Sequence, residues 1–241
     1  MTAMVVYNVK QEGIGRAIAK MLVTCGAKVY ALSRTQSDLD SLKEEVPGIS
    51  TLTVDLVDWD ATTKAVESIG PVDLLVNNAG FGIVRAFIDV TQEEFDETLN
   101  INLKAAMHVG QIVARSMISK GTGGSIVNIS SQASLMALTG HAAYSASKAG
   151  LDMLTKTMAL ELATHKIRVN SVNPTVVLTE LGKRAWADPV RSESMTSRIP
   201  MNKFAEVKDV VNAVIYLLSD KADMITGSCL PIDGGFVVAG V

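Results

Sequence analysis

The fold of this chain is constrained most by an alternation, repeated along its whole length, of short apolar runs and longer helical patterns. Several runs are β-branched and apolar at nearly every position, which is typical of strands covered on both faces. We expect strands at residues 5–7, 28–32, 51–54, 73–76, 125–129, 168–172 and 229–232. Strand and helix alternating seven times predict an α/β protein with a doubly wound, seven-stranded parallel sheet and helices on both faces.

The helical patterns between these runs carry recognisable start and stop signals. The first spans residues 13–24 and should end at Gly26, since glycine readily adopts the left-handed conformation of a helix end. Thr91 and Glu94 form a capping-box pattern, which predicts the start of a long helix that runs to about residue 119. Further helices are expected at residues 142–163 and 207–218, where apolar residues recur at three- and four-residue spacing.

Composition excludes several other classes of protein. The chain has 241 residues without a linker, repeat or low-complexity segment, and 48% are hydrophobic, so we expect residues 1–241 to form a single domain. A net charge of −3 argues against nucleic-acid binding, and no apolar run is long enough to cross a bilayer. Two cysteines, Cys25 and Cys229, cannot form a disulfide framework or a cysteine zinc cage. We therefore expect no metal, a reducing cytoplasmic compartment, and cysteines that act as small buried hydrophobic residues.

A glycine pair and a basic residue point to a dinucleotide. Gly13 and Gly15 lie between the first strand and the first helix, where glycines let a pyrophosphate approach the helix N-terminus. A tight strand–helix turn alone would explain the same pair. Arg34, followed by Thr35, lies where an NAD-binding site usually has an acidic residue. A cation there suits the 2′-phosphate of NADP, although it could also be an ordinary solvated charge.

A second constellation suggests acid–base chemistry. Tyr144 and Lys148 are four residues apart in an expected helix and so share one face. A neighbouring ammonium should lower the pKa of the tyrosine toward the working pH, which would make the pair a general acid/base. Ser131 follows the strand at 125–129 and places a hydroxyl at the same edge of the sheet. Asn102 lies in the middle of a helix, where an amide needs partners.

These residues together resemble the short-chain dehydrogenase/reductase family. The matching marks, in the order and spacing of that family, are Gly13-Ile14-Gly15, Asp55, Asn77-Asn78-Ala79-Gly80, Asn102, Ser131, Tyr144, Lys148, Asn173-Pro174 and Thr179. The resemblance implies a Rossmann-like fold and an NADPH-dependent carbonyl reductase. Stretches such as 33–42 and 126–132 are closest to the branch that interconverts L-xylulose and xylitol and reduces α-dicarbonyls. The resemblance also implies a cytosolic homotetramer, a small sugar or carbonyl substrate, and a place in xylose metabolism.

The resemblance assigns roles to individual residues. Tyr144 would donate a proton to the carbonyl oxygen, Lys148 would lower the pKa of Tyr144, Ser131 would hydrogen-bond the substrate, and Asn102 would position a water molecule. The cofactor would be held by Gly13, Ile14, Gly15, Arg34, Thr35, Asp55, Leu56, Asn78, Ala79, Gly80, Tyr144, Lys148, Pro174, Val177 and Thr179. Alongside Ser131, the substrate would contact Gln132, His141 and Trp186.

The first turn departs from the family pattern. Asn8 and Val9 stand where the family has Thr and Gly, and Glu12 stands where close relatives carry a basic residue. A β-branched residue near the phosphates and a carboxylate beside a 2′-phosphate should both weaken NADPH binding. A non-catalytic oligomer subunit of the same fold is therefore a second interpretation. A 3-ketoacyl reductase is a third, but it would need a basic docking face for an acidic carrier.

Overall fold

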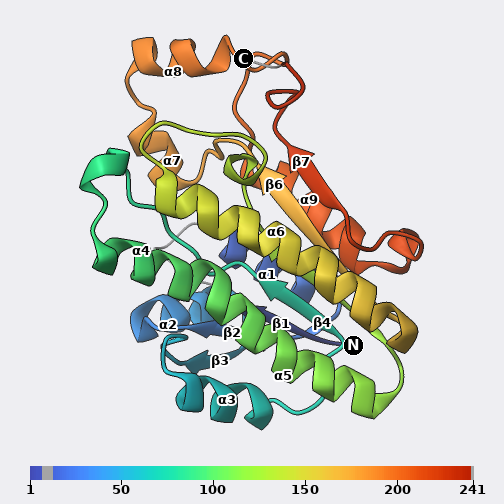
Figure 1. Cartoon of the computed structure of the whole chain (residues 1–241). Helices are drawn as coiled ribbons and strands as arrows, with labels where there is room; N and C mark the ends of the chain where they lie inside the picture. Colours follow the sequence, from blue (N-terminus) through green and yellow to red (C-terminus); the bar gives the residue numbers. More distant parts are fainter. Residues whose placement is uncertain (7–12, 240–241) are drawn as a thin grey trace.

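The structure, a computed structural model, describes residues 1–6 and 13–239. Its described strands form one sheet of seven, in the order β3-β2-β1-β4-β5-β6-β7, and every neighbouring pair is parallel (Figure 1). The strands are β1 (Thr2–Val6), β2 (Lys28–Ser33), β3 (Ser50–Thr53), β4 (Leu74–Asn77), β5 (Gly124–Ile129), β6 (Ile167–Pro174) and β7 (Cys229–Ile232). The expected doubly wound, Rossmann-like sheet is confirmed.

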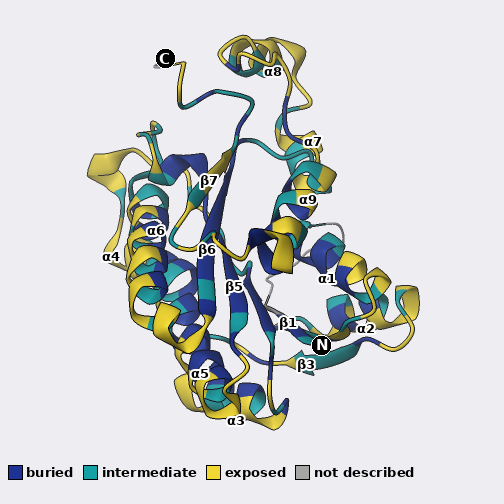
Figure 2. Ribbon diagram, turned by 90° about the vertical axis from the view of Figure 1, so that its right-hand side faces the viewer, coloured by how far each residue is buried: buried dark blue, intermediate teal, exposed yellow. Residues whose placement is uncertain are grey.

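Helices cover both faces of this sheet. Figure 2 shows α3 to α6 on one side of the strands and α1, α2 and α9 on the other. The helices are α1 (Ile14–Thr24), α2 (Gln36–Glu45), α3 (Trp59–Ser68), α4 (Gln92–Leu99), α5 (Ala105–Lys120), α6 (Ala142–Leu162), α7 (Glu180–Ala185), α8 (Pro189–Thr196) and α9 (Val207–Leu218). The short helices α7 and α8 lie apart from both layers, beyond the carboxyl ends of the strands (Figure 1).

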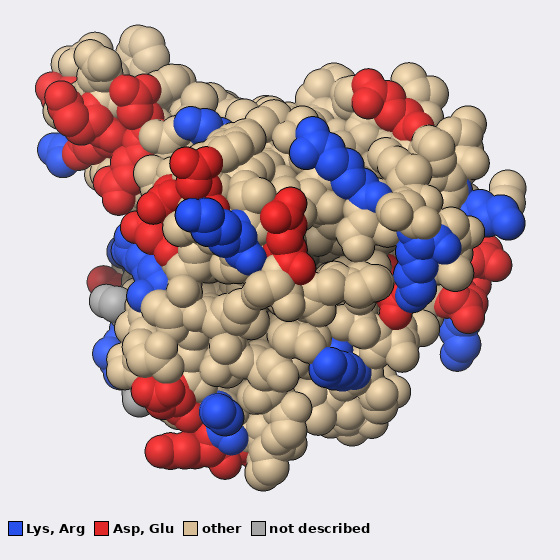
Figure 3. Space-filling model, turned by 90° about the horizontal axis from the view of Figure 1, so that it is seen from below, with Lys and Arg blue, Asp and Glu red and all other residues tan. Residues whose placement is uncertain are grey.

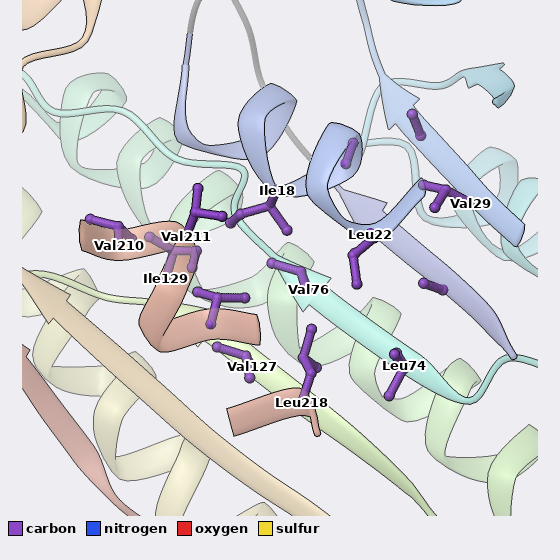
Figure 4. Close-up of a cluster of buried hydrophobic side chains, with 14 of the residues drawn as sticks. Ile18, Leu22, Val29, Leu74, Val76, Val127, Ile129, Val210, Val211 and Leu218 are labelled. Atoms are coloured by element: carbon purple, nitrogen blue, oxygen red, sulfur yellow. The ribbon is translucent and has the colours of Figure 1, made fainter. Parts of the chain in front are cut away.

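Two hydrophobic clusters hold the three layers together. Between α1, α9 and the sheet, Ile18 and Leu22 meet Val210 and Leu218 over Val76 and its strand neighbours (Figure 4). The second cluster lies on the opposite face, beneath α3, α5 and α6. Both faces of the central strands are thus buried, which explains why their sequences are apolar without alternation.

The local signals at the helix ends are confirmed. Gly26 adopts a φ of +82°, and the N–H groups of Gly26 and Ala27 bond to carbonyls of the last turn of α1. At α4, the hydroxyl of Thr91 accepts from the N–H of Glu94, whose carboxylate accepts from the N–H of Thr91 in return. These bonds satisfy backbone groups that a helix end leaves without partners.

Three expectations from the sequence are wrong in detail. The long helix from residue 91 is not continuous, because a π-helical turn, Asn100–Lys104, separates α4 from α5. Cys25 is exposed rather than buried, and Cys229 is half-buried. The first strand begins earlier than expected, at Thr2.

Two further observations concern the charge of the surface and the possibility of a membrane-spanning helix. Figure 3, seen from below, shows Lys and Arg interspersed with Asp and Glu on that face of the molecule. Within residues 1–6 and 13–239, no helix is long and apolar enough to cross a membrane. Asn8, Val9 and Glu12 lie outside the described residues, so the weakened cofactor binding expected from them stays a prediction.

Candidate active site

The carboxyl edge of the sheet collects most of the residues singled out in the sequence. Because all strands are parallel, the segments that follow β2, β3, β4, β5 and β6 leave the sheet at the same edge. Helix α6 packs against β6 and carries Tyr144 and Lys148. The topology therefore brings both residues toward Ser131, which lies two residues after the end of β5. The expected cluster is therefore assembled by the fold.

Lys148 is a buried member of this cluster. Its side chain is 3% exposed, and its Nζ donates a 2.8 Å hydrogen bond to the carbonyl oxygen of Ile129 at the end of β5. Burial lowers the pKa of Lys148 to about 8, while the charge of Asp152 acts in the opposite direction. The ammonium lies 5.8 Å from the centre of the Tyr144 ring. The lysine is therefore held in place but can still lose its proton near neutral pH.

Tyr144 and Ser131 are joined through their side chains. A hydrogen bond from the Ser131 side chain stabilises the phenolate of Tyr144, yet burial has the larger effect and raises the pKa of Tyr144 above its ordinary value. The expectation that the pKa of Tyr144 is lowered toward the working pH is wrong for the described structure, because desolvation of the phenolate outweighs the hydrogen bond from Ser131. The consequence is a neutral phenol at pH 7, which is the form that can donate a proton.

Asn102 is fully buried in the π-helical turn, and its side chain makes three hydrogen bonds. Its Nδ2 donates to the carbonyl of Phe81 (2.8 Å) and to Ser147 Oγ (3.0 Å), and its Oδ1 accepts from the N–H of Phe81 (3.0 Å). The amide thus ties the segment after β4 to helix α6. These bonds supply the partners that a mid-helix asparagine requires. Asn102 Oδ1 and Lys148 Nζ both lie against the backbone at Gly80.

Gly80 marks a close approach between these groups. A Cβ atom at this position would lie 3.1 Å from both Asn102 Oδ1 and Lys148 Nζ. Neither atom can retreat freely, because each is hydrogen-bonded elsewhere. The backbone at Gly80 can therefore lie against the lysine and the asparagine only without a side chain.

We expect Gly80→Ala to lower the rate of catalysis while the fold is retained. A displacement of a few tenths of an ångström at Lys148 should reduce kcat about 3- to 10-fold, since larger misplacements of about 1 Å cost about 100-fold. Steady-state kinetics with circular dichroism as the check on folding would measure this. The matched control is Gly110→Ala on α5, outside the site, where a Cβ would meet only the flexible end of the Met158 side chain; an unchanged kcat in Gly80→Ala would contradict the close approach.

The N-terminus of α1 is suited to phosphate groups. Gly13 is the N-cap residue in an extended conformation, and no described side chain caps the helix. Ile14 begins the helix and packs on the core, and Gly15 is buried. The free N–H groups of a first helical turn are a common anion site.

Arg34, Thr35, Asp55 and Leu56 follow β2 and β3 at the same edge. Arg34 is exposed, and Thr35 is the N-cap residue of α2, with its N–H bonded to Ser33 Oγ at 3.3 Å. Asp55 is exposed, and its Oδ1 accepts from the N–H of Val57 at 3.1 Å. These residues lie on the side of the sheet expected to hold the adenosine of a dinucleotide.

The remaining residues expected at the cofactor follow β4 and β6. Asn78 and Ala79 are half-buried and directly precede Gly80. Pro174 ends β6, while Val177 pairs with Ala205 and Thr179 caps α7 by accepting from the N–H of Gly182. Thr175, next to Pro174, has a buried hydroxyl with no hydrogen-bond partner among the described residues. An unpaired buried hydroxyl at this edge fits a polar ligand group.

The residues expected at the substrate fall into two groups. Gln132 is buried beside Ser131, and its Oε1 has no partner among the described atoms. His141 is the N-cap residue of α6, and its ring lies 6.2 Å from that of Tyr144, edge to face. Trp186 instead packs on Phe204, 5.3 Å between ring centres, with the Arg191 guanidinium over its ring. The first two lie beside the cluster, and Trp186 belongs to the apolar packing under α7 and α8.

Sequence reasoning missed a buried carboxylate next to Lys148. Asp152 is 6% exposed and lies one helical turn beyond Lys148. The four-residue spacing of Tyr144, Lys148 and Asp152 on one helix was available in the sequence, although it does not distinguish a buried face from a solvated one.

Comparison with known proteins identifies relatives along nearly the whole chain. Residues 9–237 match the family described as "Enoyl-(Acyl carrier protein) reductase". The L-xylulose reductase of Mesocricetus auratus is 56% identical over 227 residues, 94% of this chain and 93% of the relative. The D-erythrulose reductase of Gallus gallus is 56% identical over 228 residues, 95% and 93% of the two chains.

A solved structure shows the same architecture. A gluconate 5-dehydrogenase from Burkholderia cenocepacia, in complex with NADP and tartrate, superposes with a TM-score of 0.90 at 28% identity, over 98% of this chain and 95% of that one. The interpretation as a non-catalytic subunit finds no support, since the relatives are named as reductases and dehydrogenases and Asn102, Ser131, Tyr144 and Lys148 are assembled. The chain is an oxidoreductase that belongs to the short-chain dehydrogenase/reductase family.

Proposed function

We propose that the protein is an NADPH-dependent reductase of small carbonyl compounds that converts L-xylulose to xylitol and reduces α-dicarbonyls. The observation that carries the proposal is the arrangement of three side chains: Tyr144 is hydrogen-bonded to Ser131, and the buried Nζ of Lys148 lies 5.8 Å from the centre of its ring. The 56% identity to an L-xylulose reductase supports the substrate class.

The side chains divide the chemistry of reduction between them. Ser131 binds the carbonyl oxygen, where negative charge develops as the carbonyl carbon is reduced. Tyr144 gives its proton to that oxygen, which yields the alcohol, and the raised pKa keeps the phenol protonated until then. Lys148 stabilises the phenolate left behind. Asn102 holds the turn after β4 against α6. In this proposal it also positions the water molecule that links Lys148 to bulk solvent.

The residues at the carboxyl edge fit NADPH. The uncapped α1 N-terminus suits the diphosphate, and Arg34 and Thr35 suit the 2′-phosphate. Asp55, Leu56, Asn78 and Ala79 would line the adenosine side, and Pro174, Val177 and Thr179 the nicotinamide side. NADPH bound there supplies the hydride that reduces the carbonyl carbon.

Gln132 and His141 are the proposed further contacts of the substrate. Trp186 would contact it from the C-terminal end of α7. Gln132 is the best supported, since a buried amide oxygen without a partner calls for a donor such as a sugar hydroxyl. The three residues lie on different elements: the turn after β5, the start of α6 and the end of α7.

Assembly and location are part of the same proposal. We propose a homotetramer in the cytoplasm, as in the branch of the family that the sequence resembles. The long helices support it, since Leu160 and Met153 on α6 are 80% and 61% exposed and would be covered by another copy. A monomeric mass in light scattering would contradict this assembly.

The function is tested by offering the purified protein NADPH with L-xylulose or diacetyl. We expect oxidation of NADPH with either substrate, and xylitol as the product from L-xylulose. A 3-ketoacyl thioester is the competing substrate and should be reduced much more slowly. Titration of NADPH fluorescence separates the possible failures: binding without turnover contradicts the substrate class, and no binding contradicts the cofactor.

We expect the reaction to slow in alkaline solution because of Lys148. Its pKa of about 8 means that the ammonium is charged at pH 7 and is lost as the pH rises. kcat/KM for diacetyl reduction should be level near pH 7 and then fall, approaching about 10-fold per pH unit well above this pKa. The measurement is a pH profile between pH 6 and 10, with circular dichroism to confirm folding; a level profile to pH 10 would contradict it.

A further inference from the structure

A network of hydrogen bonds surrounds a buried carboxylate behind the active site. Asp152 Oδ2 accepts from Ser134 Oγ at 2.5 Å and from Asn173 Nδ2 at 2.7 Å, and Oδ1 accepts from Ser171 Oγ at 2.8 Å. The half-buried Cys229 on β7 also hydrogen-bonds this carboxylate. A buried charge is costly unless it is met by donors in this way.

These bonds join the elements that carry the reacting groups. Asp152 is on α6, the helix of Tyr144 and Lys148, whereas Ser134 is on the 3-10 turn that begins at Ser131. Asn173 Nδ2 also donates to Ser134 Oγ (2.8 Å) and to the carbonyl oxygen of Ser131 (3.2 Å). The network therefore fixes the position of Ser131 relative to the helix that carries the tyrosine and the lysine.

The carboxylate also provides the charge that Lys148 needs. Lys148 Nζ bonds to a neutral backbone carbonyl, and its burial disfavours the ammonium. Asp152, one turn along the same helix, is the charged group that acts against this loss. Since the hydrogen bonds of Asp152 hold its carboxylate in the network, its charge reaches the lysine through the low-dielectric interior.

We propose that Asp152 is a positioning residue of this active site: its carboxylate aligns Ser131 with Tyr144 and keeps the Lys148 ammonium charged. The proposal rests on the proposed function and adds to it a residue that does not touch the substrate. Within residues 1–6 and 13–239, the titratable groups that face this pair are Tyr144 on α6 and Cys229 on β7, and Lys156 acts on Cys229 from the next turn of α6.

The test is Asp152→Asn, which keeps the shape of the side chain and removes its charge. The amide oxygen can still accept from Ser134 and Asn173, so the variant should fold. We expect the alkaline limb of the pH profile of kcat/KM to move toward acid by about one unit, because one favourable charge is lost beside the lysine. At pH 8 this corresponds to about a 5-fold lower kcat/KM, with a much smaller loss at pH 6.

The matched control is Ser171→Ala, which removes one hydrogen bond of the network and leaves the charge. A purely structural role for Asp152 would make both variants less stable and leave both pH profiles where they are in the wild type. The proposal expects the shift in Asp152→Asn alone. The proposal would be overturned if the alkaline limb of the pH profile of kcat/KM stayed in place in a folded Asp152→Asn. It would also be overturned if the limb shifted equally in Ser171→Ala.

A second measurement does not depend on turnover. The titration of Lys148 can be followed by NMR of the protein with ¹³C-labelled lysine, with Lys148→Met to assign the signal. We expect its midpoint to fall by about one pH unit in Asp152→Asn. If the wild type reduces no carbonyl but the midpoint shifts, the proposed function fails and the action of Asp152 on Lys148 stands. If the wild type is active and the midpoint does not shift, the inference about Asp152 fails.

Discussion

Replacing Tyr144 by Phe should lower kcat for carbonyl reduction about 100- to 10,000-fold, because the proton donor is lost. The ring should stay in place, since it packs against the backbone at Gly82, where a Cβ would lie 3.0 Å from Tyr144 Cδ2, and against His141. The variant removes only the oxygen atom that Ser131 bonds. NADPH binding should therefore change little, and the loss should appear in kcat.

The experiment has a matched control in Tyr216→Phe. Tyr216 is an exposed tyrosine on α9, on the other face of the sheet, so the same chemical change there should leave kcat unaltered. Single-turnover measurements at saturating NADPH would separate the chemical step from product release. A folded Tyr144→Phe that reduces diacetyl at near the wild-type rate would show that another group delivers the proton.

Most of the sheet could be predicted because runs of apolar residues identify its strands. Parallel strands covered on both faces are mainly apolar, so the runs at β4 and β5 are visible without any knowledge of their partners. The order of motifs then identifies the edge where the reacting groups meet. The expected strand bounds agree with the observed ones at β7 and differ by up to three residues elsewhere, as at the start of β1, because pairing and not composition ends a strand.

The interruption of the long helix could not be predicted from local pattern. The π-helical turn at Asn100–Lys104 accommodates the three hydrogen bonds of Asn102 to Phe81 and Ser147, which come from other parts of the chain. Its only local sign is an asparagine within a helical pattern. π-Helical turns often occur where a function requires a side chain in a place that a regular helix would not reach.

The electrostatics of the site were the least predictable part. Spacing placed Lys148 beside Tyr144 correctly, but the pKa of the phenol depends on how much water surrounds it, and burial raises it. Asp152 was overlooked for the same reason, since a carboxylate in a helix is usually solvated. Both cases show that helix spacing identifies neighbours, whereas their protonation depends on the packing of the whole sheet edge.

Replacing Arg34 by Asp should reverse the preference of the enzyme from NADPH to NADH. Arg34 is exposed directly after β2, so its guanidinium is free to reach a phosphate, and its loss costs a charge-assisted hydrogen bond of about 1.5–3 kcal/mol. The new carboxylate would repel a 2′-phosphate by about 1 kcal/mol and accept a hydrogen bond from a ribose hydroxyl. Together these changes should alter the ratio of kcat/KM for the two cofactors by about 100- to 1,000-fold.

The control for this variant is Lys43→Asp, which makes the same change of net charge at the exposed far end of α2. It should leave the cofactor preference as it is, because a charge more than a Debye length away, about 10 Å at 0.1 M salt, is screened. The preference of the wild type for NADPH should weaken as salt rises, and that of Arg34→Asp for NADH should respond less, since NADH lacks the phosphate. If the ratio of kcat/KM is the same in Arg34→Asp and the wild type, Arg34 is only a solvated charge, and the 2′-phosphate is recognised elsewhere along this edge.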